Sequence, residues 1–360
     1  MRWIWPWQDR DRRFSWLKAI AFALVLLPAV RFIYQFAARD YGYLPIAFGN
    51  MTYWSGVWAT VVLLAALAVT PALTILRWRA LVDVRRMVGV TALVYTLVHV
   101  VFYFGLRSWS FTFIANETLT RATLVVATLS TIGLVVLGAT SLDAAIRYLG
   151  ARNWQRLHNT NYLFSALAIL HVMLARGTYP EQYLLTGIFI WLMAWRVLAR
   201  YRLGTDARAL ALLAVASCLF TALLEAGFLW GRRGYGPAGT LANNFNPAML
   251  EIGVPAAWQV LAFGLVFTLA AFAVAAAAGS ASRPRAWPHA GRRVVTPAHH
   301  DVRGSDVIAR RQDAPTAAAP SSAGSRRPRH RRSSPRLRGE GHTAPEVTGT
   351  QLGEGALPRV

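Results

Sequence analysis

The chain contains a series of long apolar segments separated by short charged stretches, and this pattern restricts the folds open to it. Eight segments come near the roughly 20 apolar residues that a helix needs to cross a bilayer. They are residues 16–37, 54–76, 87–106, 121–141, 157–175, 183–200, 208–230 and 256–279. Only 15% of the residues are charged, against about 25% in a soluble domain. We therefore predict an all-α fold, a polytopic membrane helix bundle.

Arginine is concentrated in every second connection between these segments, notably in residues 77–86, 147–156 and 196–202. The positive-inside rule then predicts a multi-pass membrane protein with both termini in the cytoplasm. The first segment follows basic residues, as a signal peptide would, but it is longer than the usual signal core. We expect it to be retained as an anchor. The pI of about 11.4 reflects these arginines and a basic tail, so membrane lipid, and no nucleic acid, is the expected contact.

Three histidines lie within the apolar segments, and the other five lie in the tail. His99 follows Arg86 by 13 residues, and His171 follows His158 by 13 residues. Because Arg86 and His158 both mark the inner edge, a rise of ~1.5 Å per residue carries both later histidines roughly 20 Å outward. His99 and His171 should lie at one depth near the outer face. Two imidazoles so placed can hold one haem iron between two helices.

His158 remains near the inner face, where its counterpart by depth is Arg85. Arginine does not ligate iron, but its guanidinium suits a haem propionate or a flavin phosphate. The inner site is therefore open to a second haem with an unusual sixth ligand, a flavin or a quinone. Thirteen residues separate His158 and His171 by about 140° on a straight helix, so either that helix bends or the two rings face different neighbours. Each membrane histidine could instead merely hydrogen-bond a neighbouring helix.

Other redox machinery is missing from the sequence. The single cysteine, Cys218, excludes an internal disulfide and a cysteine-ligated iron–sulfur or zinc cluster. No glycine-rich nucleotide motif follows a strand pattern, and no polar stretch is long enough for an FAD or NADPH domain. Electrons must come from a separate flavin reductase, from bound FMN or from the quinol pool. The chain is therefore expected to be a non-catalytic redox subunit.

Several short motifs accompany the histidines and resemble a known family. They are Thr70-Pro71, residues 85–89 (RRMVG), Thr120-Arg121, Thr140-Ser141, Leu149-Gly150 and residues 154–159 (WQRLHN) with Tyr162. The pattern, over roughly residues 14–203, resembles the haem-binding membrane subunit of bacterial protein-methionine-sulfoxide reductase, a branch of the ferric-reductase-like transmembrane family. Ferric reductases and NADPH oxidases have a further histidine where Arg85 stands, which favours the sulfoxide-reductase branch.

The resemblance implies an electron conduit in the bacterial inner membrane. In that family, b haems pass electrons outward to a periplasmic molybdopterin-containing subunit that reduces methionine sulfoxide in oxidised proteins. His99, His158 and His171 match the family's haem histidines, and Arg85 with Arg86 matches its inner-edge pair, associated with flavin or its reductase. One or two haem b groups are implied, with FMN or quinone at the inner site. The alternative function is direct reduction of ferric iron or another metal at the outer face, and a third is a non-redox transporter whose histidines relay protons.

The expected organisation follows from the resemblance. A cytoplasmic segment (1–15) precedes a six-span haem-binding domain (16–203), a two-span helical hairpin (204–282) is additional, and a basic tail (283–360) closes the chain. Glu225, a lone acid in the hairpin, is open to a structural role or to a role as a proton or partner site. The tail is rich in Pro, Ser, Gly, Ala and Arg and has almost no aliphatic pattern, so we predict that it is disordered.

Overall fold

The computed structural model describes residues 5–8, 11, 13–40, 42, 46–176 and 179–281. The predicted disordered tail and part of the predicted N-terminal segment lie outside these residues. An isolated antiparallel bridge joins Gln8 and Phe14, and the described chain is otherwise helical or irregular. The all-α prediction is thus confirmed for the part of the chain that the structure describes.

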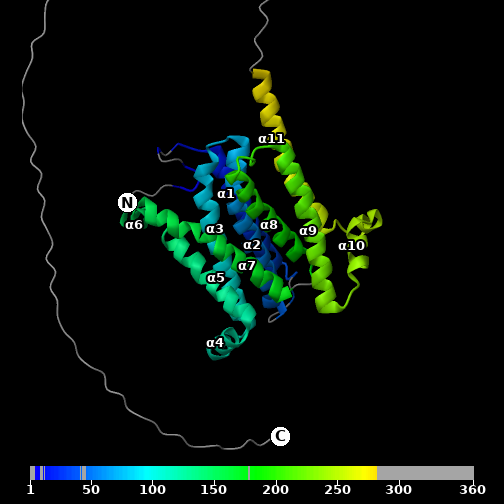
Figure 1. Ribbon diagram of the computed structural model, residues 1–360. Coiled ribbons are helices and arrows are strands. Elements are labelled where there is room, and N and C mark those ends of the chain that lie inside the picture. Colours follow the sequence, from blue (N-terminus) through cyan, green and yellow to red (C-terminus); the bar gives the residue numbers. More distant parts are fainter. Residues whose placement is uncertain are drawn as a thin grey trace, which may run out of the picture. The chain divides into compact units, whose positions relative to one another are not determined.

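The helices follow one another through the bundle with short connections (Figure 1). In chain order they are α1 (Trp16–Ala37), α2 (Ile46–Leu76), α3 (Leu81–Leu106), α4 (Phe111–Thr120), α5 (Ala122–Ala139), α6 (Asp143–Asn159), α7 (Asn161–Arg176), α8 (Pro180–Arg200), α9 (Ala207–Arg233), α10 (Pro237–Phe245), the 3-10 helix η1 (Pro247–Glu251) and α11 (Ala256–Ala281). Seven of those described, namely α1, α2, α3, α5, α8, α9 and α11, are long and apolar enough to cross a membrane.

The predicted span 157–175 is wrong at its start. Its first residues belong to α6, and α7 begins only at Asn161 and has 16 residues, fewer than a straight crossing needs. The break falls at Asn159-Thr160-Asn161, where the Thr160 hydroxyl donates to the Leu157 carbonyl oxygen at 2.6 Å. Such side chains compete with the helical backbone for hydrogen bonds and favour helix ends. His158 and His171 therefore lie on different helices, which resolves the conflict over their facing directions.

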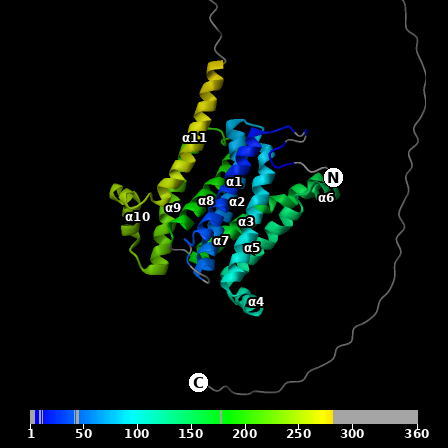
Figure 2. The same cartoon turned by 180° about the vertical axis from the view of Figure 1, so that it is seen from behind.

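Three short helices, α4, α6 and α10, were not predicted. α6 has no buried residue and bends at Gly150, whose φ of 73° is in the left-handed region that glycine adopts readily. α4 and α6 lie at opposite ends of α5 in both views (Figure 2). Segments of this kind escape a search for apolar runs, because they are short or predominantly polar.

The additional helices α9 and α11 pack directly on α8. A Cβ atom on Gly187 of α8 would lie 2.2 Å from the Thr221 hydroxyl oxygen, and one on Gly264 of α11 would lie 2.6 Å from the Ala214 Cβ. Glycine at these positions therefore allows the backbones to approach closely, as small residues do between membrane helices. Trp191 of α8 is fully buried and stacks on Phe267 of α11, with ring centroids 4.9 Å apart.

Pro71 in α2 has no N–H, so the carbonyl of Leu67, four residues earlier, loses its helical donor. Arg196 of α8 supplies a replacement, because its Nη2 donates to the Leu67 carbonyl oxygen at 2.9 Å. The same guanidinium donates to the Leu192 carbonyl oxygen and lies 4.9 Å from the Tyr162 ring centre. One arginine thus joins α2, α7 and α8 where proline interrupts α2.

We expect Arg196→Met to destabilise the protein, and to do so less in a Pro71→Ala background. The Pro71→Ala substitution would return an N–H to the Leu67 carbonyl, whose loss of a partner otherwise costs about 1–3 kcal/mol. A double-mutant cycle on thermal or denaturant unfolding measures the coupling, expected at about 1 kcal/mol. Equal costs of Arg196→Met in both backgrounds would rule out this account.

Candidate functional site: a cavity between paired histidines

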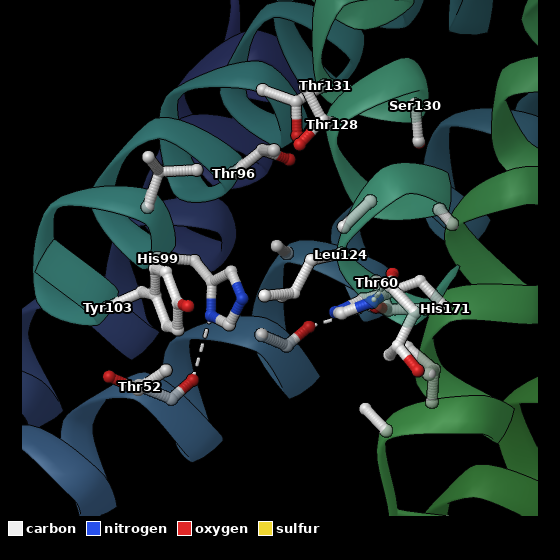
Figure 3. Close-up of a pocket in the computed structure, with 18 of the residues that line it drawn as sticks. Thr52, Thr60, Thr96, His99, Tyr103, Leu124, Thr128, Ser130, Thr131 and His171 are labelled. Atoms are coloured by element: carbon white, nitrogen blue, oxygen red, sulfur yellow. Dashed lines mark hydrogen bonds between the residues drawn. The ribbon is translucent and has the colours of Figure 1, made fainter. Parts of the chain in front are cut away.

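A cavity of about 730 Å³ opens between α2, α3, α5, α7 and α8. This volume is within the range of small-molecule and cofactor sites. Most of its wall is aliphatic or small, with Leu63, Leu124 and Leu185 among the lining residues. Two imidazoles enter it, His99 from α3 and His171 from α7 (Figure 3).

The two rings lie side by side, with centroids 6.4 Å apart and planes 66° apart. An ion bound between two imidazoles, at about 2 Å from one nitrogen of each, would place the ring centres about 6 Å apart. The observed separation therefore suits a single metal ion held by both rings. The histidines that the depth comparison places at one level are thus brought together, while their role as ligands stays a prediction.

Backbone carbonyls fix the orientation of both rings. His99 Nδ1 lies 2.8 Å from the Thr52 carbonyl oxygen, and His171 Nδ1 lies 3.1 Å from the Thr123 carbonyl oxygen. A carbonyl oxygen only accepts, so each Nδ1 carries the hydrogen and each Nε2 keeps its lone pair. This is the arrangement by which proteins orient histidine ligands and raise their basicity.

Gly56 of α2 makes room for the His99 ring. A Cβ at this position would lie 2.9 Å from His99 Cε1 and 3.0 Å from His99 Nδ1. The neighbouring Ser55 hydroxyl oxygen lies 3.3 Å from His99 Nδ1. Gly56 was not predicted from the sequence, because a glycine in an apolar run has no distinguishing signal until its neighbour across the helix pair is known.

One end of the cavity is polar. The carboxylate of Glu117 on α4 accepts hydrogen bonds from Tyr103 at 2.6 Å and Arg107 at 2.7 Å, and it forms an ion pair with Arg121 at 2.9 Å. Glu117 is only 5% exposed. No role was predicted for this cluster from the sequence. The sequence feature that could have revealed the cluster is the regular spacing of His99, Tyr103 and Arg107, which lie four residues apart on one face of α3.

His158 does not line this cavity. It stacks on Trp154 with ring centroids 4.1 Å apart, and its Nε2 lies 3.3 Å from the Thr140 hydroxyl oxygen. Burial, and then the charge of Arg85, lower the pKa of His158 below its ordinary value. Within the described residues there is no second imidazole beside it, since the remaining histidines all lie beyond residue 281.

Arg86 differs from Arg85 in its contacts. Its Nη1 lies 2.7 Å from Asp143 Oδ1, in a pair whose side chains are 49% and 71% exposed. Such a surface pair contributes little stability, about 0–1 kcal/mol, but it links α3 to the start of α6. Arg86 thus pairs with Asp143, whereas the charge of Arg85 acts on His158.

Comparison with known proteins agrees with this architecture. A family model described as the ferric reductase like transmembrane component matches residues 55–169, the stretch that holds His99 and His158. The helices and the family match together define a multi-span membrane protein of the ferric-reductase-like class. No solved structure matches the chain significantly.

Similarity to individual proteins identifies the family within this class. The heme-binding subunit MsrQ of protein-methionine-sulfoxide reductase from Azospira oryzae is 31% identical over 200 residues, which cover 55% of this chain and 85% of the relative. MsrQ from Rhodospirillum rubrum is 34% identical, with 56% and 96% covered. Magnetosome protein MamZ from Magnetospirillum gryphiswaldense is 28% identical, but only 31% of it is covered. The chain belongs to the MsrQ family.

Proposed function

We propose that this protein is a haem b electron-transfer subunit that passes electrons from a cytoplasmic flavin or quinol donor to a periplasmic methionine-sulfoxide reductase subunit. The observation that carries the proposal is the pair of imidazoles 6.4 Å apart in a largely apolar cavity. Family membership supplies the reaction, because the relatives are named as heme-binding subunits of protein-methionine-sulfoxide reductase.

The residues of the cavity fit a haem. His99 and His171 would hold the iron through Nε2, and the Thr52 and Thr123 carbonyls would keep both rings in place. The haem would supply one-electron transfer, while the ligands and the apolar walls would set its potential. No general base or nucleophile is needed for this role. The partner that receives the electrons is proposed to be a periplasmic molybdopterin-containing subunit.

The topology proposed for this role places both termini in the cytoplasm of a bacterial cell with the protein in the inner membrane. It counts α7 as a crossing, because α7 packs along α5 and carries His171 to the level of His99. Eight crossings then put the arginine-rich connections on the inner side, as the positive-inside rule requires. The outer end of α3 and the start of α5 face the periplasm.

Electrons are proposed to enter at the opposite, inner end, near Arg85, Arg86 and His158. The His158 ring stacked on Trp154 could contact a flavin or quinone, and Arg85 could bind a flavin phosphate. The proposed occupant of this inner site is FMN, quinone or a second haem bound at His158. A single haem between His99 and His171 is the minimum that the proposal requires.

The direct test is an optical spectrum of the purified protein. We expect a Soret band and a reduced α band typical of haem b, with a pyridine haemochrome assay that gives at least one haem per chain. Dithionite-reduced protein should be reoxidised by a methionine-sulfoxide reductase subunit supplied with methionine sulfoxide. A colourless protein from haem-replete cells would refute the proposal and favour a non-redox membrane role.

A second test addresses the entry site. We expect Arg85→Ala with Arg86→Ala to slow haem reduction by the cytoplasmic donor while haem content stays the same, because neither arginine lines the haem cavity. The matched control is Arg200→Ala with Arg202→Ala, at the connection after α8. Stopped-flow reduction measures the rates, and unchanged kinetics in the Arg85/Arg86 variant would contradict an inner-site role.

Direct reduction of ferric iron or another metal at the outer face is the second candidate. The ferric-reductase-like family match favours it. Reduced protein would then be oxidised by a ferric chelate as fast as by the sulfoxide-reductase subunit, and the gene would rescue iron uptake.

A further inference from the structure

The polar end of the cavity has the chemistry of a carboxylate-binding site. We propose that Arg107 and Arg121 bind the propionate carboxylates of the haem, and this inference rests on the proposed function. Both arginines line the same cavity as His99 and His171. Propionates are the charged groups of haem b, and arginine recognises carboxylates through paired N–H donors.

The position of Arg107 follows from α3. It comes eight residues after His99, or about 12 Å further along the helix axis. Its side chain turns back into the cavity, since Arg107 Nη2 reaches Glu117 and the guanidinium carbon lies 5.5 Å from the Tyr103 ring centre. The guanidinium thus lies between the outer end of α3 and the imidazoles.

Arg121 reaches the same place from α5. It immediately precedes α5, two residues before Thr123, whose carbonyl oxygen fixes His171. Arg121 Nη1 lies 2.9 Å from Glu117 Oε1, the oxygen that also accepts from Arg107. The two guanidinium groups therefore lie together at one end of the cavity.

Glu117 organises the two arginines without neutralising them. Its carboxylate accepts from Tyr103 and Arg107, pairs with Arg121, and carries one negative charge against two positive ones. Arg107 Nε is buried and has no hydrogen-bond partner. A buried donor without an acceptor is costly, and a second carboxylate in the cavity would satisfy it and balance the remaining charge.

The start of α8 contributes buried acceptor atoms to the cavity wall, and such atoms do not favour an ionised carboxylate beside them. Glu181 Oε2 and Gln182 Oε1 line the cavity side of α8 and are buried without a hydrogen-bond partner. Both atoms are acceptors as placed. Arg107 and Arg121, and not the start of α8, are therefore the groups of the cavity wall that would bind the propionates.

The experiment compares two ligands. Purified full-length apoprotein is titrated with ferric haem and with haem dimethyl ester, which lacks the carboxylate charges. We expect wild-type protein to bind haem about 10- to 100-fold more tightly than the ester, as charge-assisted hydrogen bonds would give. Arg107→Gln and Arg121→Gln should each reduce this preference while ester binding is kept. Arg208→Gln, at an exposed position of α9 outside the cavity, is the matched control and should leave the preference unchanged.

The outcomes separate the two proposals. Wild-type protein that binds haem and its ester equally would overturn the propionate assignment while leaving the haem proposal intact. Wild-type protein that binds neither would overturn the proposed function itself. If Arg107→Gln lost both ligands through misfolding, the wild-type comparison and Arg121→Gln, whose side chain is 64% exposed, would still decide the assignment.

Discussion

Replacing His99 or His171 with alanine should remove almost all of the bound haem. Each replacement leaves the iron with a single protein ligand and opens a gap in an apolar wall. Loss of a supporting hydrogen bond to a ligand histidine alone costs about 10- to 100-fold in metal affinity, and loss of the ligand itself should exceed this. Soret absorbance per chain, measured after purification from haem-replete cells, gives the result.

His158→Ala is the matched control for this prediction, because His158 lies on α6 and outside the cavity. It should keep the spectrum of the haem held by the pair. Imidazole added to His99→Ala should restore part of the six-coordinate spectrum by entering the vacated space. Full haem retention in both His99→Ala and His171→Ala would exclude the pair as ligands.

Gly56→Ala should also abolish most haem binding, although it adds only one methyl group. Its Cβ would lie 2.9 Å from His99 Cε1, closer than real contacts allow. Either the His99 ring or α2 must then shift, and a displaced ring leaves the Thr52 carbonyl and the line to His171. Spectroscopy should show loss of haem, or a change to five-coordinate, high-spin iron in the fraction retained.

The control is Gly227→Ala on α9, where a Cβ would meet nothing within 4 Å. Alanine in a helix is favoured over glycine by about 0.5–1 kcal/mol, so this variant should unfold at the same or a higher temperature and keep its haem. Gly56→Ala gains the same helical preference, so its haem loss cannot be ascribed to a weaker helix. An unchanged spectrum in Gly56→Ala would show that His99 is not confined by α2.

The histidine pair could be located from the sequence because a membrane gives all crossing helices a common measure of depth. Counting residues from Arg86 and from His158 places His99 and His171 at one level, and the structure brings their rings together. The same count treated 157–175 as one helix. It failed there because Asn159-Thr160-Asn161 lies within an otherwise continuous segment and interrupts the helix without an obvious change in hydropathy.

The remainder of the site depends on contacts between helices. Gly56 matters because α2 lies against α3, and the role of Arg107 depends on α4 returning Glu117 to the end of α3. α4 is a ten-residue helix that no apolar run in the sequence predicts. Regular spacing from His99 could have suggested Tyr103 and Arg107 as its companions, but no spacing rule would have supplied their acidic partner.

The close fit of α9 and α11 on α8 has a consequence for how the protein can be dissected. α8 forms a wall of the cavity through Gln182 and Leu185 and also receives α9 at Gly187. A chain shortened after residue 203 would expose to lipid a surface shaped for another backbone, with Trp191 uncovered. α9 and α11 thus support α8 where it lines the cavity, and a shortened form of this protein has to include both helices.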